Sequence, residues 1–243
     1  MNIYETPKLL AEYLLFHYGK DEEVLPWSFG PKTALGFATR SVTELLDRSI
    51  VPANAHALDL GCAVGRSCYE LADVAADVLG MDYSYAFIQA AEMLRLEGRL
   101  AYLRHDEAAA NTELVALRPK HGDADRIHFE QGDAMNLRED LGSFDIVHAA
   151  NLLCRLTEPK QLLDRLPSLV KSGGQLLLTT PCTWLEEFTP SSNWPQGSTF
   201  DWLQCELSDH FTLAHRADLP FLIREHARKF QWSVALGTRW IRK

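Results

Sequence analysis

One short stretch restricts the possible folds of this chain more than any other: Ala57-Leu58-Asp59-Leu60-Gly61-Cys62-Ala63-Val64-Gly65-Arg66-Ser67. It reads as an apolar strand, a turn bounded by Gly61 and Gly65, and a helix that begins at Arg66. Because glycine has no Cβ, such a turn brings bare backbone against a ligand at a helix N-terminus. The glycines are spaced G-x-x-x-G and not as the G-x-G-x-x-G of dinucleotide-binding folds. The alternative is an ordinary strand-to-helix turn without a ligand.

Later strands also end in side chains that can bind a ligand. The run Val78-Leu79-Gly80-Met81-Asp82 ends in an acid, and an acid at the end of a second strand accepts hydrogen bonds from ribose hydroxyls. Residues 127–134 alternate like a strand and end in Gly132-Asp133-Ala134. A fourth strand is expected over 144–151 and a fifth over 173–181. A single aspartate of this kind is more often a helix cap, but strand ends in this order indicate a binding site along one sheet edge.

An acid followed by closely spaced glycines, with these later acids, resembles class I S-adenosylmethionine (SAM) methyltransferases, although Ala63 replaces their middle glycine. The resemblance implies an α/β, Rossmann-like fold with a mostly parallel seven-stranded sheet and helices on both faces. It implies SAM as cofactor, S-adenosylhomocysteine as product and no metal, with Asp133 accepting a hydrogen bond from the adenine amino group. The expected cofactor-binding residues are Asp59, Gly61, Cys62, Gly65, Asp82, Tyr83, Asp133, Ala134 and Asn151.

Periodicity predicts how the elements follow one another. Helical spacing of apolar residues predicts helices over 7–18, ended by Gly19, and over 31–50. Alternating strands and helices predict a parallel sheet with right-handed crossovers over 55–60, 66–75, 77–82, 84–98, 127–131, 144–150, 159–171 and 175–180. The remaining expectations are an inserted hairpin within 100–126, a helix over 200–207, and a closing antiparallel pair at 211–219 and 232–241. We expect one domain, 1–243, with a helical cap over 1–50 and a core over 51–243.

Composition excludes several classes of protein. The chain is 47% hydrophobic and 23% charged, as expected of a soluble α/β domain. No apolar run approaches the about 20 residues of a membrane helix, and the N-terminus lacks a signal-peptide pattern. Five cysteines whose spacing fits no disulfide framework predict a reducing, cytoplasmic setting. The sequence contains no C-x-x-C pair that would suggest a metal site. The net charge of −9 disfavours nucleic acid as a partner and favours a small-molecule substrate.

The acceptor of the methyl group should lie beyond the fourth and fifth strands, because ligands of open α/β sheets bind at the carboxyl ends of strands. Those ends read Asn151-Leu152-Leu153-Cys154-Arg155 and Pro181 to Phe188. Arg155, the aromatic Trp184 and Phe188, and Glu186 or Glu187 suit a small zwitterion with a flat ring. The alternative for the tryptophans at 184 and 194 is packing within a lid.

Several longer motifs resemble a more specific family, the 4-mercaptohistidine (5-thiohistidine) N1-methyltransferases, which also occur as the C-terminal domain of ovothiol synthase. The matching segments are 16–19, 29–32, 61–67, 82–84, 149–156, 183–190 and 219–232. The resemblance implies methylation of the imidazole ring of 5-thiohistidine to give ovothiol A. A chain that starts at Met1 is expected to be the stand-alone form, acting with a separate 5-histidylcysteine sulfoxide synthase. The implied catalytic residues are Asn151, Arg155 and Tyr83, and the substrate-binding ones are Arg40, Arg155, Trp184, Phe188, Arg224 and Tyr18.

The chemistry of this acceptor sets two demands. Its thiolate is a softer nucleophile than the ring nitrogen, so the pocket must turn sulfur away, and no residue type in the sequence identifies the group that does this. A hydrogen-bond acceptor should orient the ring, and Asn151 is the first candidate because it ends the fourth strand. Aromatic residues of the cap and of the second strand end are expected to close over the donor: Tyr4, Tyr13, His17, Tyr18 and Tyr83.

Other functions remain open at this point. They are methylation of another small histidine-like or heteroaromatic acceptor, a SAM-binding regulatory protein without turnover, and a dinucleotide oxidoreductase. The methylated nitrogen, the general base and the oligomeric state are not determined by the sequence.

Overall fold

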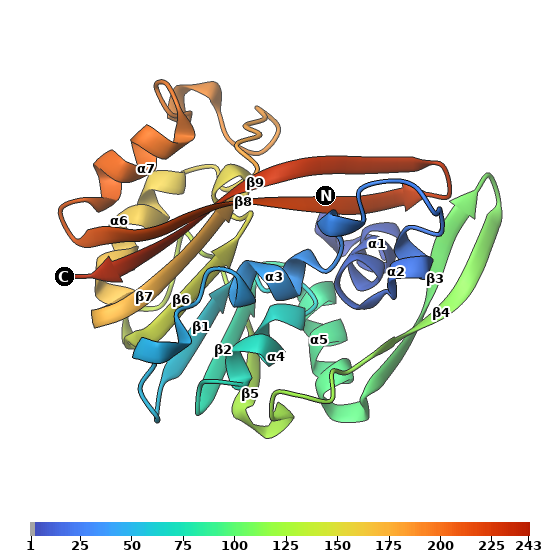
Figure 1. Ribbon diagram of the computed structural model, residues 1–243, viewed down its shortest axis with the longest axis horizontal. Helices are drawn as coiled ribbons and strands as arrows, with labels where there is room; N and C mark the ends of the chain where they lie inside the picture. The colour runs from blue at the N-terminus through green and yellow to red at the C-terminus, as the bar shows by residue number, and fades with distance from the viewer. Residues whose placement is uncertain (1–2) are drawn as a thin grey trace.

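A seven-stranded sheet forms the centre of the computed structural model, which describes residues 3–243 (Figure 1). The strand order is β5-β2-β1-β6-β7-β9-β8. The first five strands run parallel, β9 is antiparallel to β7, and β8 is antiparallel to β9. The predicted α/β class I methyltransferase fold is confirmed. The strands are β1 (His56–Leu60), β2 (Asp77–Asp82), β5 (Ile127–Gln131), β6 (Phe144–Ala150), β7 (Val170–Thr180), β8 (Phe211–His226) and β9 (Lys229–Arg242).

Helices cover both faces of the sheet because successive side chains of each strand point to opposite faces. Leu58 and Leu60 of β1 pack in the cluster that includes α6 and α7, whereas Ala57 packs in the cluster that includes α3 and α4. The helices are α1 (Pro7–Tyr18), α2 (Asp21–Val24), α3 (Phe37–Thr43), α4 (Arg66–Ala72), α5 (Tyr85–Glu97), α6 (Pro159–Leu169) and α7 (Thr199–Leu207). No helix within residues 3–243 is both long and apolar enough to cross a membrane.

The helix predicted over 31–50 is wrong in its extent. The segment forms a 3-10 turn at Lys32–Ala34, the short helix α3, and a second 3-10 turn at Arg48–Ile50. Gly36 precedes α3 with φ +66°, a left-handed conformation that ends any continuous helix. The apolar stripe is nevertheless correct, since Val42 and Leu45 are fully buried.

Two hairpins extend from the core (Figure 1). The one predicted within 100–126 is confirmed as β3 (Arg99–Glu107) paired with β4 (Ala110–Leu117). The closing pair is longer than predicted, because β8 and β9 continue pairing from Pro220 to His226 beyond the main sheet. Pro220 is tolerated since β8 is an edge strand, where a missing N–H disrupts no ladder. Ala227 N donates to Asp106 O (2.7 Å), which joins the tips of the two hairpins.

Candidate active site

A cavity of about 660 Å³ lies at the carboxyl ends of the parallel strands. The glycine turn, the ends of β2, β6 and β7, and the segment after β5 form one side of it. The helices α1 and α3 and the extended part of β8 contribute the other side. Segments far apart in the chain therefore meet around one cavity at the sheet edge where ligands of such folds bind.

The glycine turn has the conformation that its sequence predicts. Gly61 and Gly65 have φ of +71° and +80°. A Cβ on Gly61 would lie 3.1 Å from Leu152 Cδ1, so a side chain there would crowd the cavity wall. Ala63 adopts φ +49° where the family has glycine, and it lines the cavity. Gly65 and Cys62 do not line the cavity; Gly65 caps α4, and Cys62 N donates to Met81 O (3.0 Å).

Asp82 is a buried carboxylate at the end of β2 that faces this turn. Its oxygens accept hydrogen bonds from Ala63 N (2.9 Å) and Ser84 N (2.8 Å). Burial raises the pKa of Asp82 to about 6, although these backbone donors oppose the shift. Tyr83 lies beside it, 60% exposed, and lines the cavity. A carboxylate with two spare lone pairs at this place can accept hydrogen bonds from two hydroxyls.

The remaining predicted cofactor-binding residues that face the cavity lie at two other strand ends. Asp133 and Ala134 follow β5, and Asp133 Oδ1 accepts from Met135 N (2.9 Å). Asn151 follows β6 with φ +54°, and its Oδ1 accepts a hydrogen bond from Thr179 Oγ1 (2.9 Å). The structure thus brings Gly61, Asp82, Tyr83, Asp133, Ala134 and Asn151 to one cavity.

Asp59 lies below the turn and not on the cavity surface. Its Oδ1 bonds His148 Nδ1 (2.7 Å), and its Oδ2 accepts from Ser67 Oγ (2.5 Å) and Cys68 Sγ (3.3 Å). Burial alone raises the pKa of Asp59, but His148 and these hydrogen bonds hold it below its ordinary value. His148 Nε2 continues the network to Ser41 Oγ (3.1 Å). Asp59 therefore stabilises the turn indirectly, by accepting hydrogen bonds from Ser67 and Cys68 in the helix that follows it.

Sequence reasoning missed this network, although one signal was present. Asp59 and His148 are direct register partners on β1 and β6, and each is flanked on both sides by apolar residues. Two such residues at the same level of neighbouring strands indicate a buried pair, because neither can be left unpaired in a core.

The acceptor end of the cavity contains Arg155, Phe188 and Glu187. The guanidinium carbon of Arg155 lies 4.6 Å from the ring centroid of Phe188. Burial raises the pKa of Tyr4, and the neighbouring Arg155 opposes that shift. Within residues 3–243, Arg155 is the only arginine or lysine that lines the cavity.

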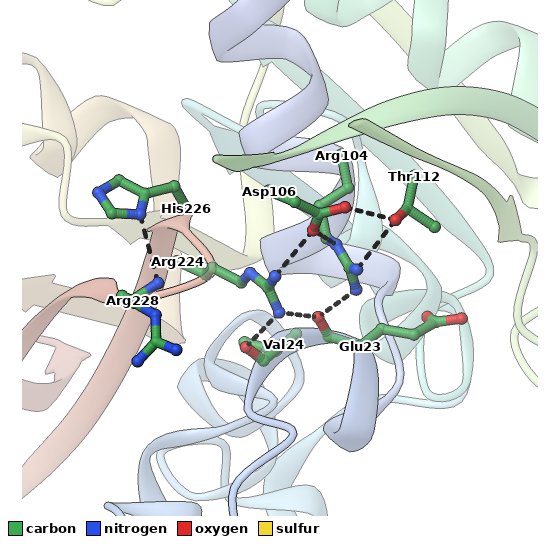
Figure 2. A network of polar contacts seen from close by, with 8 residues as sticks. All are labelled: Glu23, Val24, Arg104, Asp106, Thr112, Arg224, His226 and Arg228. Atoms are coloured by element: carbon green, nitrogen blue, oxygen red, sulfur yellow. Dashed lines mark hydrogen bonds and ion pairs between the residues drawn. The ribbon is translucent and has the colours of Figure 1, made fainter. Parts of the chain in front are cut away.

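Arg224, expected to bind substrate, lies instead in a buried structural network (Figure 2). Its guanidinium pairs with Asp106 Oδ1 (3.0 Å) and donates to Glu23 O (2.9 Å). Burial raises the pKa of Asp106, but Thr112, Arg104 and Arg224 together hold it below its ordinary value. The network joins β8 to β3 and to the end of α2, so Arg224 fixes the position of the hairpins.

Three other predicted substrate residues also lie outside the cavity lining. Arg40 is held by the carbonyls of Leu35 (2.9 Å) and Pro220 and pairs with Glu44. Trp184 donates to Thr199 Oγ1 (3.0 Å) and packs edge-on against Trp202, the lid packing given as its alternative. Tyr18 donates its hydroxyl to Val64 O (2.8 Å) and so fastens α1 to the glycine turn.

Two groups of aromatic rings wall the cavity, and sequence reasoning assigned most of them no role. Phe16, Phe37 and Phe221 contact one another, with centroids 5.0–6.3 Å apart. Tyr4, Tyr13, Phe87 and Phe188 form a second group. These rings come from α1, α3, α5 and β8, from the 3-10 turn Ile3–Glu5 (Tyr4) and from the segment after β7 (Phe188), which only the fold brings together. The walls suit a flat, largely apolar acceptor.

Comparison with known protein families shows which family this chain belongs to. A model described as a methyltransferase domain matches residues 33–226. The chain belongs to this methyltransferase family. Its fold is the class I methyltransferase fold that the glycine turn and the strand-end acids predicted.

Relatives and solved structures are consistent with this family. The chain is 25% identical, over 62% of its length, to a ubiquinone biosynthesis O-methyltransferase of Xanthomonas axonopodis pv. citri, of which 53% is covered. It is 26% identical to the Coxiella burnetii (strain RSA 493) protein of the same name over 56% of the chain, covering 48% of that protein. The chain spans about half the length of the curated relatives it matches. The cyclase SpnF shares the fold with a TM-score of 0.58 and 16% identity, over 97% of this chain and 96% of SpnF. The N-methyltransferase NodS of Bradyrhizobium japonicum WM9 does so with a TM-score of 0.52 and 17% identity, over 82% and 93%.

The residues present fit SAM at this cavity. Gly61 lets the backbone approach a ligand closely, since a Cβ there would project toward Leu152 on the wall. Asp82 would hold the ribose hydroxyls, and Asp133 would hold the adenine amino group through its second oxygen. SAM bound there supplies a methyl group on a positively charged sulfur. Within residues 3–243 no cluster of histidine, cysteine or acidic side chains could hold a metal ion.

Proposed function

We propose that this protein methylates an imidazole nitrogen of 5-thiohistidine to give ovothiol A. One observation carries the proposal: an arginine and an acid lie at a cavity with aromatic walls, and neither has an ion-pair partner. Within residues 3–243, neither Arg155 nor Glu187 makes an ion pair, although both line the cavity. A free amino acid presents one carboxylate and one ammonium group, and the planar guanidinium of arginine suits a carboxylate.

The aromatic walls support a flat ring as the third part of this acceptor. Phe188 lies under the guanidinium of Arg155, so an amino acid held at Arg155 has its ring near the aromatic groups. Walls of low polarity exclude water, and fixed alignment of two reactants contributes as much as about 7–11 kcal/mol in ideal cases. The residues of the site thus bind and orient, while the ring nitrogen itself attacks.

A second candidate is O-methylation of a phenolic ring. It is favoured by the relatives named ubiquinone biosynthesis O-methyltransferases and by the same aromatic walls. A phenol without an amino acid group would leave Arg155 and Glu187 without ion-pair partners, and for this reason we place it second.

The deciding experiment is incubation of the purified protein with SAM and 5-thiohistidine, histidine or a catechol, with products resolved by mass spectrometry and NMR. The proposal predicts an N-methylated imidazole, and NMR identifies which nitrogen carries the methyl group. Methylation of the catechol, with neither imidazole modified, would establish the second candidate instead.

Arginine variants test the carboxylate contact. Arg155→Lys is expected to raise the Michaelis constant for the acceptor about tenfold, because lysine loses one of two charge-assisted hydrogen bonds. The affinity for SAM, measured by calorimetry, should not change. Arg40→Lys and Arg224→Lys are the matched controls, since both arginines bind protein groups outside the cavity. A wild-type Michaelis constant in Arg155→Lys would show that another group holds the carboxylate.

A further inference from the structure

His17 is a buried imidazole whose hydrogen-bonding capacity the protein itself does not use. It lies in the last turn of α1 and lines the cavity. Its ring stacks on Tyr13, with centroids 5.8 Å apart and 28° between the planes, and meets the edge of Phe16 at 5.3 Å. Its Nδ1 is buried without a hydrogen-bond partner. Native structures rarely leave a buried polar group unpaired, so this one requires an explanation.

The surroundings determine which ring nitrogen carries the proton. Burial lowers the pKa of His17 to about 3, so the ring is neutral near pH 7 and has a single N–H. A buried N–H without an acceptor is rarer than an unpaired acceptor lone pair. The proton therefore lies on Nε2. This atom has no hydrogen-bond partner within residues 3–243, and unlike Nδ1 it is not buried. His17 is a neutral donor available to a molecule in the cavity.

Neighbouring polar side chains at the cavity do not share this property. Ser41 Oγ donates to Ala38 O (3.2 Å) and meets His148 Nε2 (3.1 Å). Ser67 donates to Asp59. Both serines line the cavity, yet protein groups already occupy their hydroxyls. Within residues 3–243, His17 therefore offers a cavity-facing N–H that no protein group accepts.

We propose that His17 determines which atom of the acceptor is methylated, by donating Nε2–H to an electron-rich atom that must not react. The inference rests on the proposed function, in which this atom is the sulfur of 5-thiohistidine. Sulfur beside the rings of Tyr13 and Phe16 also gains favourable contacts with their edges. A thiolate held there points away from the methyl donor, and the nitrogen lone pair becomes the nucleophile.

The transfer balances without a proton acceptor in the protein. The reacting form of the acceptor is a thiolate with a neutral ring, so a second ring proton leaves to water before the transfer. The new N–C bond forms as the C–S bond of the sulfonium breaks, and the electron pair of that bond stays on the sulfur of S-adenosylhomocysteine. The product is an N-methylimidazolium thiolate, so a neutral histidine is sufficient beside it.

The test compares His17→Phe with His17→Gln. Phenylalanine keeps the stacking on Tyr13 and removes the donor, whereas glutamine restores an N–H at a similar reach. With 5-thiohistidine, His17→Phe is expected to raise the Michaelis constant about tenfold and to release S-methylated product. With histidine, which lacks the sulfur, it should change the Michaelis constant little. His17→Gln should restore N-methylation.

Tyr13→Phe is the matched control, because it removes a polar group from the neighbouring ring and leaves His17 in place. It should still give only N-methylated product. If His17→Phe keeps wild-type selectivity and Michaelis constant for 5-thiohistidine, His17 is wall packing and the inference is overturned.

A binding measurement separates this inference from the proposed function. The Nε2–H resonance of His17 in ¹⁵N-histidine-labelled protein, assigned by its loss in His17→Phe, is followed on adding 4-mercaptoimidazole or imidazole in the presence of S-adenosylhomocysteine. A downfield shift with the sulfur-bearing ring alone supports the donor role, even if the protein methylates neither 5-thiohistidine nor histidine. No shift with either ring overturns it, whatever the enzyme methylates.

Discussion

At the scale of single residues, Asp82 combines burial with the absence of a cation. Within residues 3–243 it forms no ion pair, and only the N–H groups of Ala63 and Ser84 stabilise its charge. Burial therefore dominates and raises the pKa to about 6. Such a carboxylate is costly in the free protein and becomes favourable when ligand hydroxyls donate to it. Asp82 thus lowers the stability of the free protein and would contribute to the binding of a ligand that donates hydrogen bonds to it.

The cost of burying this charge predicts an unusual pH dependence for the stability of Asp82→Asn relative to the wild type. The folded-state pKa of Asp82 lies above the ordinary value of 3.8, so the unfolded chain loses its proton first as the pH rises. The carboxyl group therefore destabilises the wild type progressively between pH 4 and 6 and by a constant amount above that. Two pKa units correspond to roughly 3 kcal/mol. Urea unfolding from pH 4 to 8 should show Asp82→Asn gaining stability over the wild type across this window.

The same variant should bind SAM at least tenfold more weakly, since it loses hydrogen bonds to a charged group. A stability difference that does not change with pH would mean that Asp82 ionises normally in the folded protein.

At the scale of elements, the turn between β1 and α4 shows why glycine is needed for two separate reasons. Gly61 leaves room for the side chain of Leu152 on the cavity wall, whereas Gly65 leaves room for Phe129 and Ala91 inside the fold. A Cβ on Gly65 would lie 2.5 Å from Phe129 Cζ and 3.1 Å from Ala91 Cβ. Gly65 also has φ +80°, where any other residue is strained. The packing of β5 and α5 against the turn therefore requires this glycine.

Gly65→Ala and Gly36→Ala form a matched pair that separates backbone strain from crowding. Both glycines have left-handed φ, but nothing lies within 4 Å of a Cβ on Gly36. Gly36→Ala should cost only the strain, about 1–2 kcal/mol. Gly65→Ala should cost a further 1–3 kcal/mol or so from overpacking against Phe129. Chemical denaturation measures both, and equal losses would show that Phe129 moves aside freely.

At the scale of the whole molecule, the cavity is a product of topology. Parallel strands place the ends of β1, β2, β5 and β6 at one edge, and α1 and the long β8 close over that edge (Figure 1). The network around Arg224 joins β8 to β3, which fixes the extended part of β8 against the β3–β4 hairpin (Figure 2). The cavity thus depends on contacts between residues that lie far apart in the chain.

A ligand that bridges so many elements should stabilise the folded chain. S-adenosylhomocysteine at a hundred times its dissociation constant contributes about 2.7 kcal/mol. For a chain of 243 residues this raises the melting temperature by roughly 5–10 °C. NADH at the same concentration should have no effect, because the turn lacks the dinucleotide spacing. Stabilisation by NADH and not by S-adenosylhomocysteine, followed by scanning fluorimetry, would return the oxidoreductase alternative to consideration.

The sequence by itself determined the fold and the strand-end residues of the cavity, because these depend on local patterns. Alternating apolar strands and helices specify a parallel sheet, and its strand ends must then share an edge. Asp82 and Asp133 were found as acids directly after apolar runs, and both line the cavity. The helix predicted over 31–50 failed at Gly36, since an apolar stripe does not reveal a left-handed residue within it.

Only the tertiary structure decided the acceptor end. Arg224 and Arg155 are both arginines within distinctive motifs, and nothing local separates the one that pairs with Asp106 from the one that faces the cavity. Asp59 pairs with His148 across two strands, and Phe221 meets Phe16 and Phe37 across the fold. Burial and pairing depend on which residues meet in space, and for residues distant in sequence only the folded chain determines this.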